Sequence, residues 1–524
     1  MITNIKNFAD KLNLVRTIAV VSGLISIAAI WYCYTHGYII AYGDSESHLN
    51  IAKRVVDSIT PGFAQLGGIW LPLPHLLMVP LVKIDFLWRT GLAGSIISGL
   101  AFVVSSVFIY KITYLLTQNK AAGIVAVLVF VTNPNILYLQ STPMTELLLI
   151  AFFTLSSFYF ISYIKNQANL NYLMLAGFFG FCASLTRYDG WFLVLIEALI
   201  ISIINFPVSL HAWKKLEGTI ILYSTLAFFG ILLWLTWGYL ILGDPLYFTH
   251  SEFSAKSQQG GWLARGELPA YKHLLTSGLY YFFTSMSNVG VFIFAVSLLG
   301  FLVYIFYRPS KEKFLVALLL TTAFIFYVVT LYLGQSVIFI RPLTPASFEW
   351  TLFNVRYGIM MVPAAAIFFA YLFSKIRPVV LKSAVIGIFM LQFGLFASGR
   401  TQVLSFEDGI HGLSSQNPPD AQNWIAEHYD SGMVLMDDYA RTVSVVKTGI
   451  PMQEMIYVGN KPYWEESLVT PDKYATWVIM QKDDSVWKSI IDNPTIQDRL
   501  YAHFQKVYTS PNILIFHRTD LAKN

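Results

Sequence analysis

The sequence contains little charge and almost no cysteine. Only 12% of its 524 residues are charged, and its two cysteines, Cys33 and Cys182, both fall inside apolar segments. These features argue against a disulfide framework and a cysteine-based metal site. The sequence also lacks a phosphate-binding glycine motif, a zinc-ligand spacing, a Ser-His-Asp order and an internal repeat. Its net charge of +5 gives no indication of nucleic-acid binding.

Hydrophobic residues, by contrast, make up 56% of the chain, and the mean hydropathy of +0.57 is far above that of a soluble domain. A helix needs roughly 20 apolar residues to cross the hydrocarbon core of a bilayer. We therefore predict an α-helical polytopic membrane protein. The sequence indicates about eleven spans, near residues 17–40, 91–116, 121–139, 146–164, 170–186, 190–207, 219–242, 274–306, 314–334, 357–374 and 381–399.

The basic residues predict the orientation of these spans, because Lys and Arg in short loops remain cytoplasmic. When the spans alternate, one side collects Lys6, Lys11, Arg16, Lys120, Lys165, Lys214, Lys215, Arg308, Lys311, Lys313, Lys375 and Arg377. The first span has no small-residue cleavage pattern, so we expect it to be retained. The N-terminus is then cytoplasmic, and we expect a multi-pass protein of a bacterial or archaeal plasma membrane.

The composition changes near residue 400, which predicts two domains. Residues 1–399 form the membrane domain, with extracytoplasmic loops at 41–90, 243–273 and 335–356. Residues 400–524 form an extracytoplasmic α/β domain, because an odd number of spans leaves the tail outside. In this tail we predict strands at 433–436, 477–480 and 513–516, and helices at 419–428 and 484–491.

The loop after the first span carries two acids, Asp44 and Glu46. A carboxylate at the end of a membrane helix is partly desolvated, which raises its basicity and suits a general base acting on an alcohol or an amine. Asp44 is the first candidate. The alternative is that Asp44 caps the following helix, since Asp is a favoured residue at that position.

Five short motifs, all on the predicted extracytoplasmic side, give the chain a resemblance. They are Gly43-Asp44-Ser45-Glu46, Leu71-Pro72-Leu73-Pro74-His75-Leu76-Leu77, Thr142-Pro143-Met144-Thr145-Glu146, Gly243-Asp244-Pro245-Leu246-Tyr247-Phe248 and Arg356-Tyr357. Because these motifs occur in this order and on one side, the chain resembles the GT-C class of membrane glycosyltransferases. The resemblance is greatest to the protein-mannosyltransferase and aminoarabinose-transferase-like group (glycosyltransferase family 39-like). That group uses polyprenyl-phosphate sugars, so the resemblance implies a GT-C-like membrane domain with this activity.

The resemblance also implies roles for single residues. Asp44 corresponds to the catalytic base, Glu146 to a second acidic position and Arg356 to an arginine near the lipid phosphate, which a planar guanidinium can hold at two oxygens. Arg356 could instead snorkel to the membrane interface, and Glu146 could simply favour the start of its helix. Ser45 separates Asp44 from Glu46, unlike the pattern of close relatives, so the role of Glu46 stays open.

Further candidates surround these residues, each with two interpretations. Arg187 is either a second phosphate contact or the ion-pair partner of Asp189. Lys53 and Arg54, on a helix predicted over 51–58 parallel to the interface, meet lipid phosphates nonspecifically or hold the donor phosphate. The substrate-binding set is completed by His48, His75 and Tyr357.

Two further groups of residues are candidates for a metal site and a ligand site. Asp44, Glu46 and His48 alternate along the chain, so a divalent cation is an alternative, although the reaction requires no cofactor because arginine alone can stabilise a lipid monophosphate. In the tail, Asp437-Asp438-Tyr439 follows a predicted strand. Ligands often bind there, but turns after strands are also rich in Asp.

Together these observations predict an inverting glycosyltransferase. The donor is a dolichyl- or undecaprenyl-phosphate sugar, hexosyl or pentosyl, and the acceptor is an extracytoplasmic protein, lipid or glycan. The donor is expected between the first loops and the helix at Arg356, with its lipid tail against the spans. The main rival is a membrane transporter or lipid flippase, since intramembrane charges also mark transport pathways. A receptor or scaffold is a third reading, which would not need the acidic first loop.

Overall fold

The computed structural model describes residues 2–206, 209–251, 254–413, 415, 420–438 and 443–519. Residues 417–419, where the sequence indicates the start of the tail domain, lie outside this set, as does Tyr439. The chain forms two compact units. The first contains residues 1–42, 68–74 and 94–415, and the second contains residues 43–67, 75–93 and 416–524.

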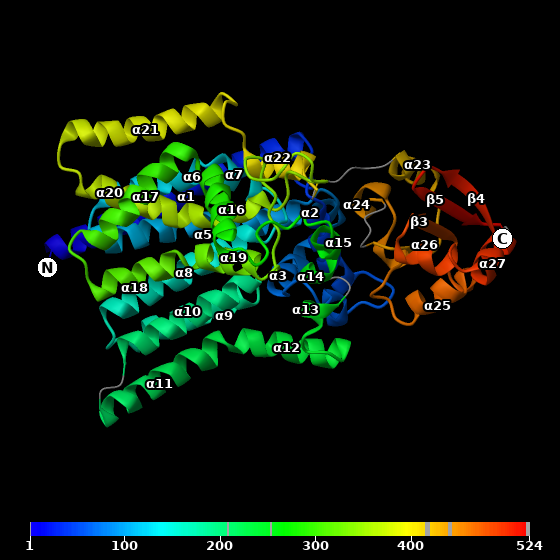
Figure 1. The fold of residues 1–524 in the computed structure, drawn as a ribbon, viewed down its shortest axis with the longest axis horizontal. Coiled ribbons are helices and arrows are strands. Elements are labelled where there is room, and N and C mark those ends of the chain that lie inside the picture. The colour runs from blue at the N-terminus through cyan, green and yellow to red at the C-terminus, as the bar shows by residue number, and fades with distance from the viewer. Residues whose placement is uncertain are drawn as a thin grey trace. The chain divides into compact units, whose positions relative to one another are not determined.

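The first unit is a bundle of apolar helices (Figure 1). Its elements are α1 (Ile2–Thr35), α5 (Leu92–Thr117), α6 (Lys120–Val131), α7 (Pro134–Leu139), α8 (Glu146–Lys165), α9 (Leu170–Ser184), α10 (Tyr188–Ile204), α11 (Leu210–Ala227), α12 (Phe229–Leu242), α13 (Tyr247–His250), α14 (Ala255–Gln258), α15 (Gly260–Ala264), α16 (Leu274–Val289), α17 (Val291–Phe306), α18 (Lys311–Leu320), α19 (Thr322–Tyr332), the 3-10 helix η2 (Val355–Met361), α20 (Val362–Lys375), α21 (Val379–Ala397) and α22 (Leu404–His411).

The helices of this unit are long and apolar enough to identify an integral membrane protein. Among the described residues, five helices could each cross a bilayer: part of α1, then α5, α8, η2 with α20, and α21. Three further pairs reach that length only together and are bent, α11 with α12 by 47°, α16 with α17 by 114° and α18 with α19 by 55°. The predicted count of eleven spans stays a prediction.

The largest bend interrupts the run at 274–306, which the sequence suggests is one continuous span. Gly290 lies between α16 and α17 with φ of +95°, a backbone conformation that side chains disfavour. A Cβ at this position would also approach the Gln392 side chain to 2.7 Å. The lack of a side chain therefore allows the turn, which hydropathy alone does not reveal.

One buried carboxyl group lies within the membrane helices. Glu197 of α10 accepts hydrogen bonds from Ser156 Oγ on α8, at 2.8 Å, and from the Tyr223 hydroxyl on α11. The Glu197 and Tyr223 side chains are fully buried. Because a buried polar group is costly without partners, these bonds link three neighbouring helices.

The second unit contains a five-stranded sheet in the order β2-β1-β3-β5-β4. Its elements are α2 (Gly43–Val56), the 3-10 helix η1 (Phe63–Leu66), most of α3 (Leu73–Val82), α4 (Asp85–Arg89), α23 (Asp420–His428), β1 (Val434–Met436), α24 (Val445–Thr448), the 3-10 helix η3 (Met452–Glu454), β2 (Met455–Ile456), α25 (Tyr463–Val469), the 3-10 helix η4 (Pro471–Lys473), β3 (Trp477–Gln481), α26 (Ser485–Ile490), α27 (Pro494–His503), β4 (Phe504–Thr509) and β5 (Ile513–Arg518).

The three predicted strands are confirmed as β1, β3 and β5, and the two predicted helices as α23 and α26. Asp484 caps α26, because its carboxylate accepts a hydrogen bond from the Trp487 amide at 2.7 Å. Strands β1, β2 and β3 are parallel, while β5 runs antiparallel to β3 and β4. The sheet core includes Leu435, Val478 and Phe516, and Ile59 from the segment after α2 packs against it.

The segment after the first span differs from expectation. We predicted a loop followed by a helix over 51–58, whereas α2 already begins at Gly43 and ends at Val56. Asp44 and Glu46 lie in its first turn and Lys53 and Arg54 in its last turn, which favours the helix because these charges oppose its dipole. The first half of the helix was missed because its sequence is polar on average, so a search for apolar runs does not find it.

Candidate functional site

Two arginines converge on one carboxylate in the first unit. Glu146 Oε1 accepts from Arg187 Nη1 at 3.0 Å and from Arg356 Nε at 3.2 Å. The Glu146 side chain is fully buried and Arg356 is only 4% exposed. The interpretation of Arg356 as a cation reaching for the membrane interface therefore does not describe its position. A buried charge needs a close partner, and each arginine finds one in Glu146.

Two further acids extend this group. Arg187 Nε lies 3.3 Å from Asp189 Oδ2, and Arg356 Nη1 lies 3.9 Å from Asp408 Oδ2. The two arginines thus face three carboxylates, so the formal charges leave an excess of one negative charge. We call these five residues the arginine cluster. Both interpretations of Arg187 remain, since its bond to Asp189 leaves other N–H groups directed elsewhere.

Tyrosines enclose the arginine cluster. The Tyr357 ring lies 5.2 Å from the Arg187 guanidinium and 5.1 Å from that of Arg356. Arg187 Nη2 donates to the Tyr327 hydroxyl at 3.3 Å, and the Tyr42 hydroxyl donates to Asp408 Oδ2 at 3.2 Å. Aromatic faces attract cations, so these rings help to hold both guanidinium groups in place.

The starts of three helices supply the central residues of the cluster. Glu146 is the first residue of α8, Arg187 precedes α10 in an extended conformation, and Arg356 lies in the 3-10 helix that leads into α20. Asn354 has a left-handed φ of 54° just before this 3-10 helix, and its side-chain Nδ2 donates to the Val337 carbonyl at 3.1 Å. The motifs at Glu146 and Arg356 were correctly predicted to open helices.

The second unit holds the candidates of the first extramembrane segment. On α2, Asp44 is partly exposed, whereas Glu46 and His48 are 5% and 3% exposed. Glu46 Oε1 accepts from the Val446 amide at 3.3 Å. A group that removes a proton from a substrate must be reachable, which favours Asp44 over Glu46 as the base.

The two histidine candidates contact one another. His48 Nδ1 lies 2.9 Å from His75 Nε2, within hydrogen-bonding distance, and His75 is fully buried. One imidazole must donate and the other accept in such a contact. The structure thus places these residues as a pair, and their proposed contact with substrate stays a prediction.

The two cationic candidates of α2 are buried beside acids. Lys53 is 5% exposed, and its ammonium lies 3.1 Å from Asp57 and 3.7 Å from Asp85. Arg54, 8% exposed, pairs with Asp438 and lies 3.9 Å from the ring centre of Tyr457. Burial lowers the pKa of Arg54 below its usual value and raises that of Tyr457. Their proposed phosphate contacts stay predictions.

A metal site is not formed by the residues that the structure describes. Among them, no three His, Cys, Asp or Glu side chains are grouped so as to hold an ion. Asp44, Glu46 and His48, which alternate in the sequence, follow one another along α2 instead. Asp44 and His48 are four residues apart and share a face of the helix, but Glu46, two residues from each, is rotated away from both by about 160°.

Three important members of this site were not among the predicted residues. Asp408 lies on α22, far from Arg356 in the sequence, and its side chain is fully buried. Tyr42 and Tyr327 are also missed, because a tyrosine near a membrane interface usually needs no special explanation. The acidic, helix-compatible stretch around Asp408 after the last span is the signal that could have identified it.

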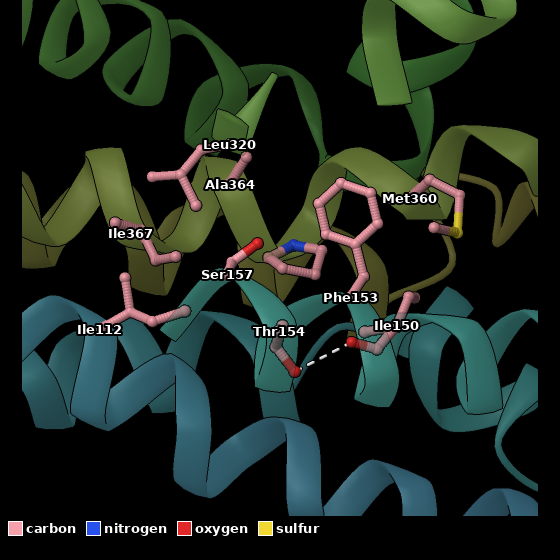
Figure 2. Close-up of a pocket in the computed structure, with 10 residues that line it drawn as sticks. Ile112, Ile150, Phe153, Thr154, Ser157, Leu320, Met360, Ala364 and Ile367 are labelled. Carbon is pink, nitrogen blue, oxygen red and sulfur yellow. Dashed lines mark hydrogen bonds between the residues drawn. The ribbon is translucent and has the colours of Figure 1, made fainter. Parts of the chain in front are cut away.

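A small, mostly apolar pocket is lined by side chains of α5, α8, α18, η2 and α20 (Figure 2). Its lining includes Ile150, Phe153, Met360 and Ala364, with Thr154 bonded back to the Ile150 carbonyl at 2.9 Å. Ile150 follows Glu146 by one turn of α8, a rise of about 6 Å, and Met360 follows Arg356 by four residues. The pocket therefore lies further along α8 and the η2–α20 segment than the two charged residues.

Among known proteins, solved structures are similar to this chain in fold, whereas sequence comparisons find no match. No protein-family model and no curated protein matches the sequence. Among solved structures, ArnT from Cupriavidus metallidurans bound to undecaprenyl phosphate matches with 10% identity and a TM-score of 0.58, over 95% of this chain and 98% of that one. Its apo form matches with 11% identity and a TM-score of 0.55, over 97% and 98%. This chain has the fold of a GT-C membrane glycosyltransferase.

A second GT-C protein is also similar. The oligosaccharyltransferase of Archaeoglobus fulgidus, crystallised with zinc and sulfate, has 12% identity and a TM-score of 0.49, over 96% of this chain and 73% of that one. The GT-C fold predicted from the five motifs is confirmed by the likeness to ArnT.

Proposed function

We propose that this protein is a glycosyltransferase that moves a sugar from a polyprenyl-phosphate donor to an extracytoplasmic protein, lipid or glycan. The observation that carries the proposal is the convergence of Arg187 and Arg356 on Glu146 in a GT-C fold. ArnT, which shares this fold, was crystallised with undecaprenyl phosphate. Two converging guanidinium groups suit the phosphate of such a lipid, because each can donate two parallel hydrogen bonds.

The reaction we propose is an inverting displacement. Asp44 removes the proton from an acceptor hydroxyl or amine, and the acceptor atom attacks the anomeric carbon. The bond from that carbon to the phosphate oxygen breaks, and the lipid phosphate leaves with the electron pair. Arg356 and Arg187 stabilise the charge that develops on the phosphate, where preorganised donors act most strongly.

The contacts within the arginine cluster suggest how the phosphate of the donor binds. Glu146 holds both guanidinium groups at hydrogen-bonding distance, while Asp408 lies 3.9 Å from Arg356 in a longer contact. An arriving phosphate would replace the longer contact at the lower energetic cost. The lining of the pocket by Ile150, Phe153 and Met360 is apolar, and we propose that the isoprenyl chain of the donor follows this side of α8.

The Arg356→Lys variant tests the phosphate contact. An ammonium keeps the charge but cannot make a planar two-point contact, so we expect weaker use of the donor. Measured with undecaprenyl phosphate in detergent, the Kd should rise about tenfold, which corresponds to roughly 1.4 kcal/mol. Arg377→Lys, on the predicted cytoplasmic side, is the matched control. Equal donor affinity in both variants would remove Arg356 from the donor site.

A reporter fusion tests the proposed orientation. The predicted alternation of spans puts the C-terminus outside, so a phosphatase fused there should be active, whereas a fusion in the short loop near Arg308 should be inactive. The reverse pattern would place the C-terminal domain in the cytoplasm and contradict an extracytoplasmic acceptor.

A further inference from the structure

Helix α2 is polar in sequence and yet enclosed. Eleven of its 14 residues are buried, including the charged Glu46, Lys53 and Arg54. Charged side chains are rarely buried unless they have partners. The partners of Glu46 and Arg54 come from the C-terminal part of the same compact unit, more than 380 positions along the chain.

The last turn of α2 is held by its arginine. Arg54 Nη2 makes an ion pair with Asp438 at the end of β1, and the two side chains are 10% and 14% exposed. The guanidinium also stacks on Tyr457, which follows β2, at 3.9 Å from the ring centre. We call Arg54, Asp438 and Tyr457 the clasp. A desolvated cation–π contact is stronger than an exposed one, and the loss of one partner of a buried ion pair is costly because it leaves the other charge unpaired.

A network of hydrogen bonds connects Tyr457 of the clasp to the segment that follows α2. The Tyr457 hydroxyl donates to Gln65 Oε1 at 2.5 Å, and Gln65 Nε2 donates to the Gly459 carbonyl at 3.1 Å. Asn460 Nδ2 donates to Thr60 Oγ1 at 3.2 Å. The segment that follows α2 is therefore bound to the same loop that presents Tyr457.

The first turn of α2 is held as well. Glu46 accepts from the Val446 amide in α24 at 3.3 Å, and Arg89 of α4 donates to the carbonyls of Val446 and Gly449, both at 3.4 Å. Short helix α24 thus contacts α2 near its start, while β1 and the Tyr457 loop contact it near its end. A rigid helix held at both ends has a defined direction.

We propose that the C-terminal domain positions the catalytic turn of α2, with Arg54 acting as a positioning residue through the clasp it forms with Asp438 and Tyr457. The inference rests on the proposed function, in which Asp44 is the base. Arg54 follows Asp44 by ten residues, about 15 Å along the helix axis. A small tilt at the clasp therefore displaces the Asp44 carboxylate, and a misplacement of about 1 Å can cost on the order of 10²-fold in rate.

The test compares kinetics with hydrogen exchange in the full-length protein. Asp438→Asn leaves the Arg54 charge without its counter-charge, so kcat should fall about 10- to 100-fold while the KM for the polyprenyl-phosphate sugar changes less than twofold. Amide exchange in peptides covering residues 43–56 should become faster. Asp472→Asn is the matched control, because Asp472 also pairs with an arginine, Arg499, in the same compact unit, and its side chain is 12% exposed, close to the 14% of Asp438. The control should leave kcat and exchange at 43–56 unchanged.

Two further variants keep the test decisive if Asp438→Asn folds poorly. Arg54→Lys keeps the ion pair but loses the flat stacking on Tyr457, and should lower kcat less than Asp438→Asn. The double variant Arg54→Gln with Asp438→Asn leaves no unpaired buried charge, so folding should recover, whereas kcat should stay low because the clasp is absent.

The outcomes separate this inference from the proposed function. Normal kcat and normal exchange at 43–56 in Asp438→Asn would overturn the positioning role, as would an equal loss in Asp472→Asn. If Asp44→Asn stays active, the proposed base is wrong, whatever the clasp variants do. An inactive Asp44→Asn together with a fully active Asp438→Asn would leave the transferase proposal standing and reject the clasp alone.

Discussion

Turnover by the Asp44→Asn variant should fall by about 10²- to 10⁴-fold, because an amide cannot accept the proton of the acceptor. Asp44 lies in the first turn of α2 and is partly exposed, so its side chain can reach a substrate. Asparagine has nearly the same size and still provides an oxygen at the start of a helix. Expression, thermal stability and donor binding should therefore change little, and single-turnover kinetics should locate the loss in the chemical step.

The Glu46→Gln variant shows whether Asp44 or Glu46 is the catalytic base. Glu46 is buried and bonded to the Val446 amide, a bond that the glutamine carbonyl can still accept. We expect a smaller effect on kcat than in Asp44→Asn. A nearly fully active Asp44→Asn with an inactive Glu46→Gln would transfer the base role to Glu46.

The largest loss of stability is expected for Glu146→Gln. Removing this charge leaves Arg187 and Arg356 with a neutral amide where they now share a carboxylate, in a fully buried position. Breaking a buried ion pair typically costs about 3–5 kcal/mol, and we expect the lower end of this range because Asp189 and Asp408 still face the two arginines. The midpoint of thermal unfolding in detergent should therefore drop clearly, and bound undecaprenyl phosphate should restore part of it by giving the arginines a new anion.

Glu312→Gln is the matched control for this experiment. Glu312 pairs with Lys165 at 2.7 Å, but both side chains are more than one-third exposed. Exposed pairs contribute roughly 0–1 kcal/mol, so this variant should unfold almost like the wild type. If Glu146→Gln behaved in the same way, the arginine cluster would not be needed to hold the helix ends together.

Local patterns explain which parts of the fold could be predicted. The strands around Leu435, Val478 and Ile515 are buried apolar runs, and such runs are visible in any sequence. Thr145 and Glu146 mark a helix start by their chemistry alone, and α8 begins there. Strands β2 and β4 were missed, because β2 has only two residues and β4 alternates little.

Long-range partners explain what could not be predicted. Lys53 and Arg54 look like cations at a lipid surface until Asp57, Asp85 and Asp438 are placed beside them. A sequence pattern shows charge but not burial, and only the fold supplies the partners. The same limit applies to Asp408, whose importance depends entirely on its approach to Arg356.

The buried carboxyl group of Glu197 has a consequence for how the chain is made. Helix α10 has only 17 residues, and a carboxylate near the middle of a membrane helix makes insertion of that helix alone unfavourable by roughly 2.5–3.5 kcal/mol. In the folded protein Ser156 and Tyr223 satisfy this group. Ser156 is synthesised before α10 and Tyr223 only after it. The Glu197 carboxyl group therefore gains its second partner only when α11 joins the bundle, and we expect α11 to stabilise α10 during biosynthesis.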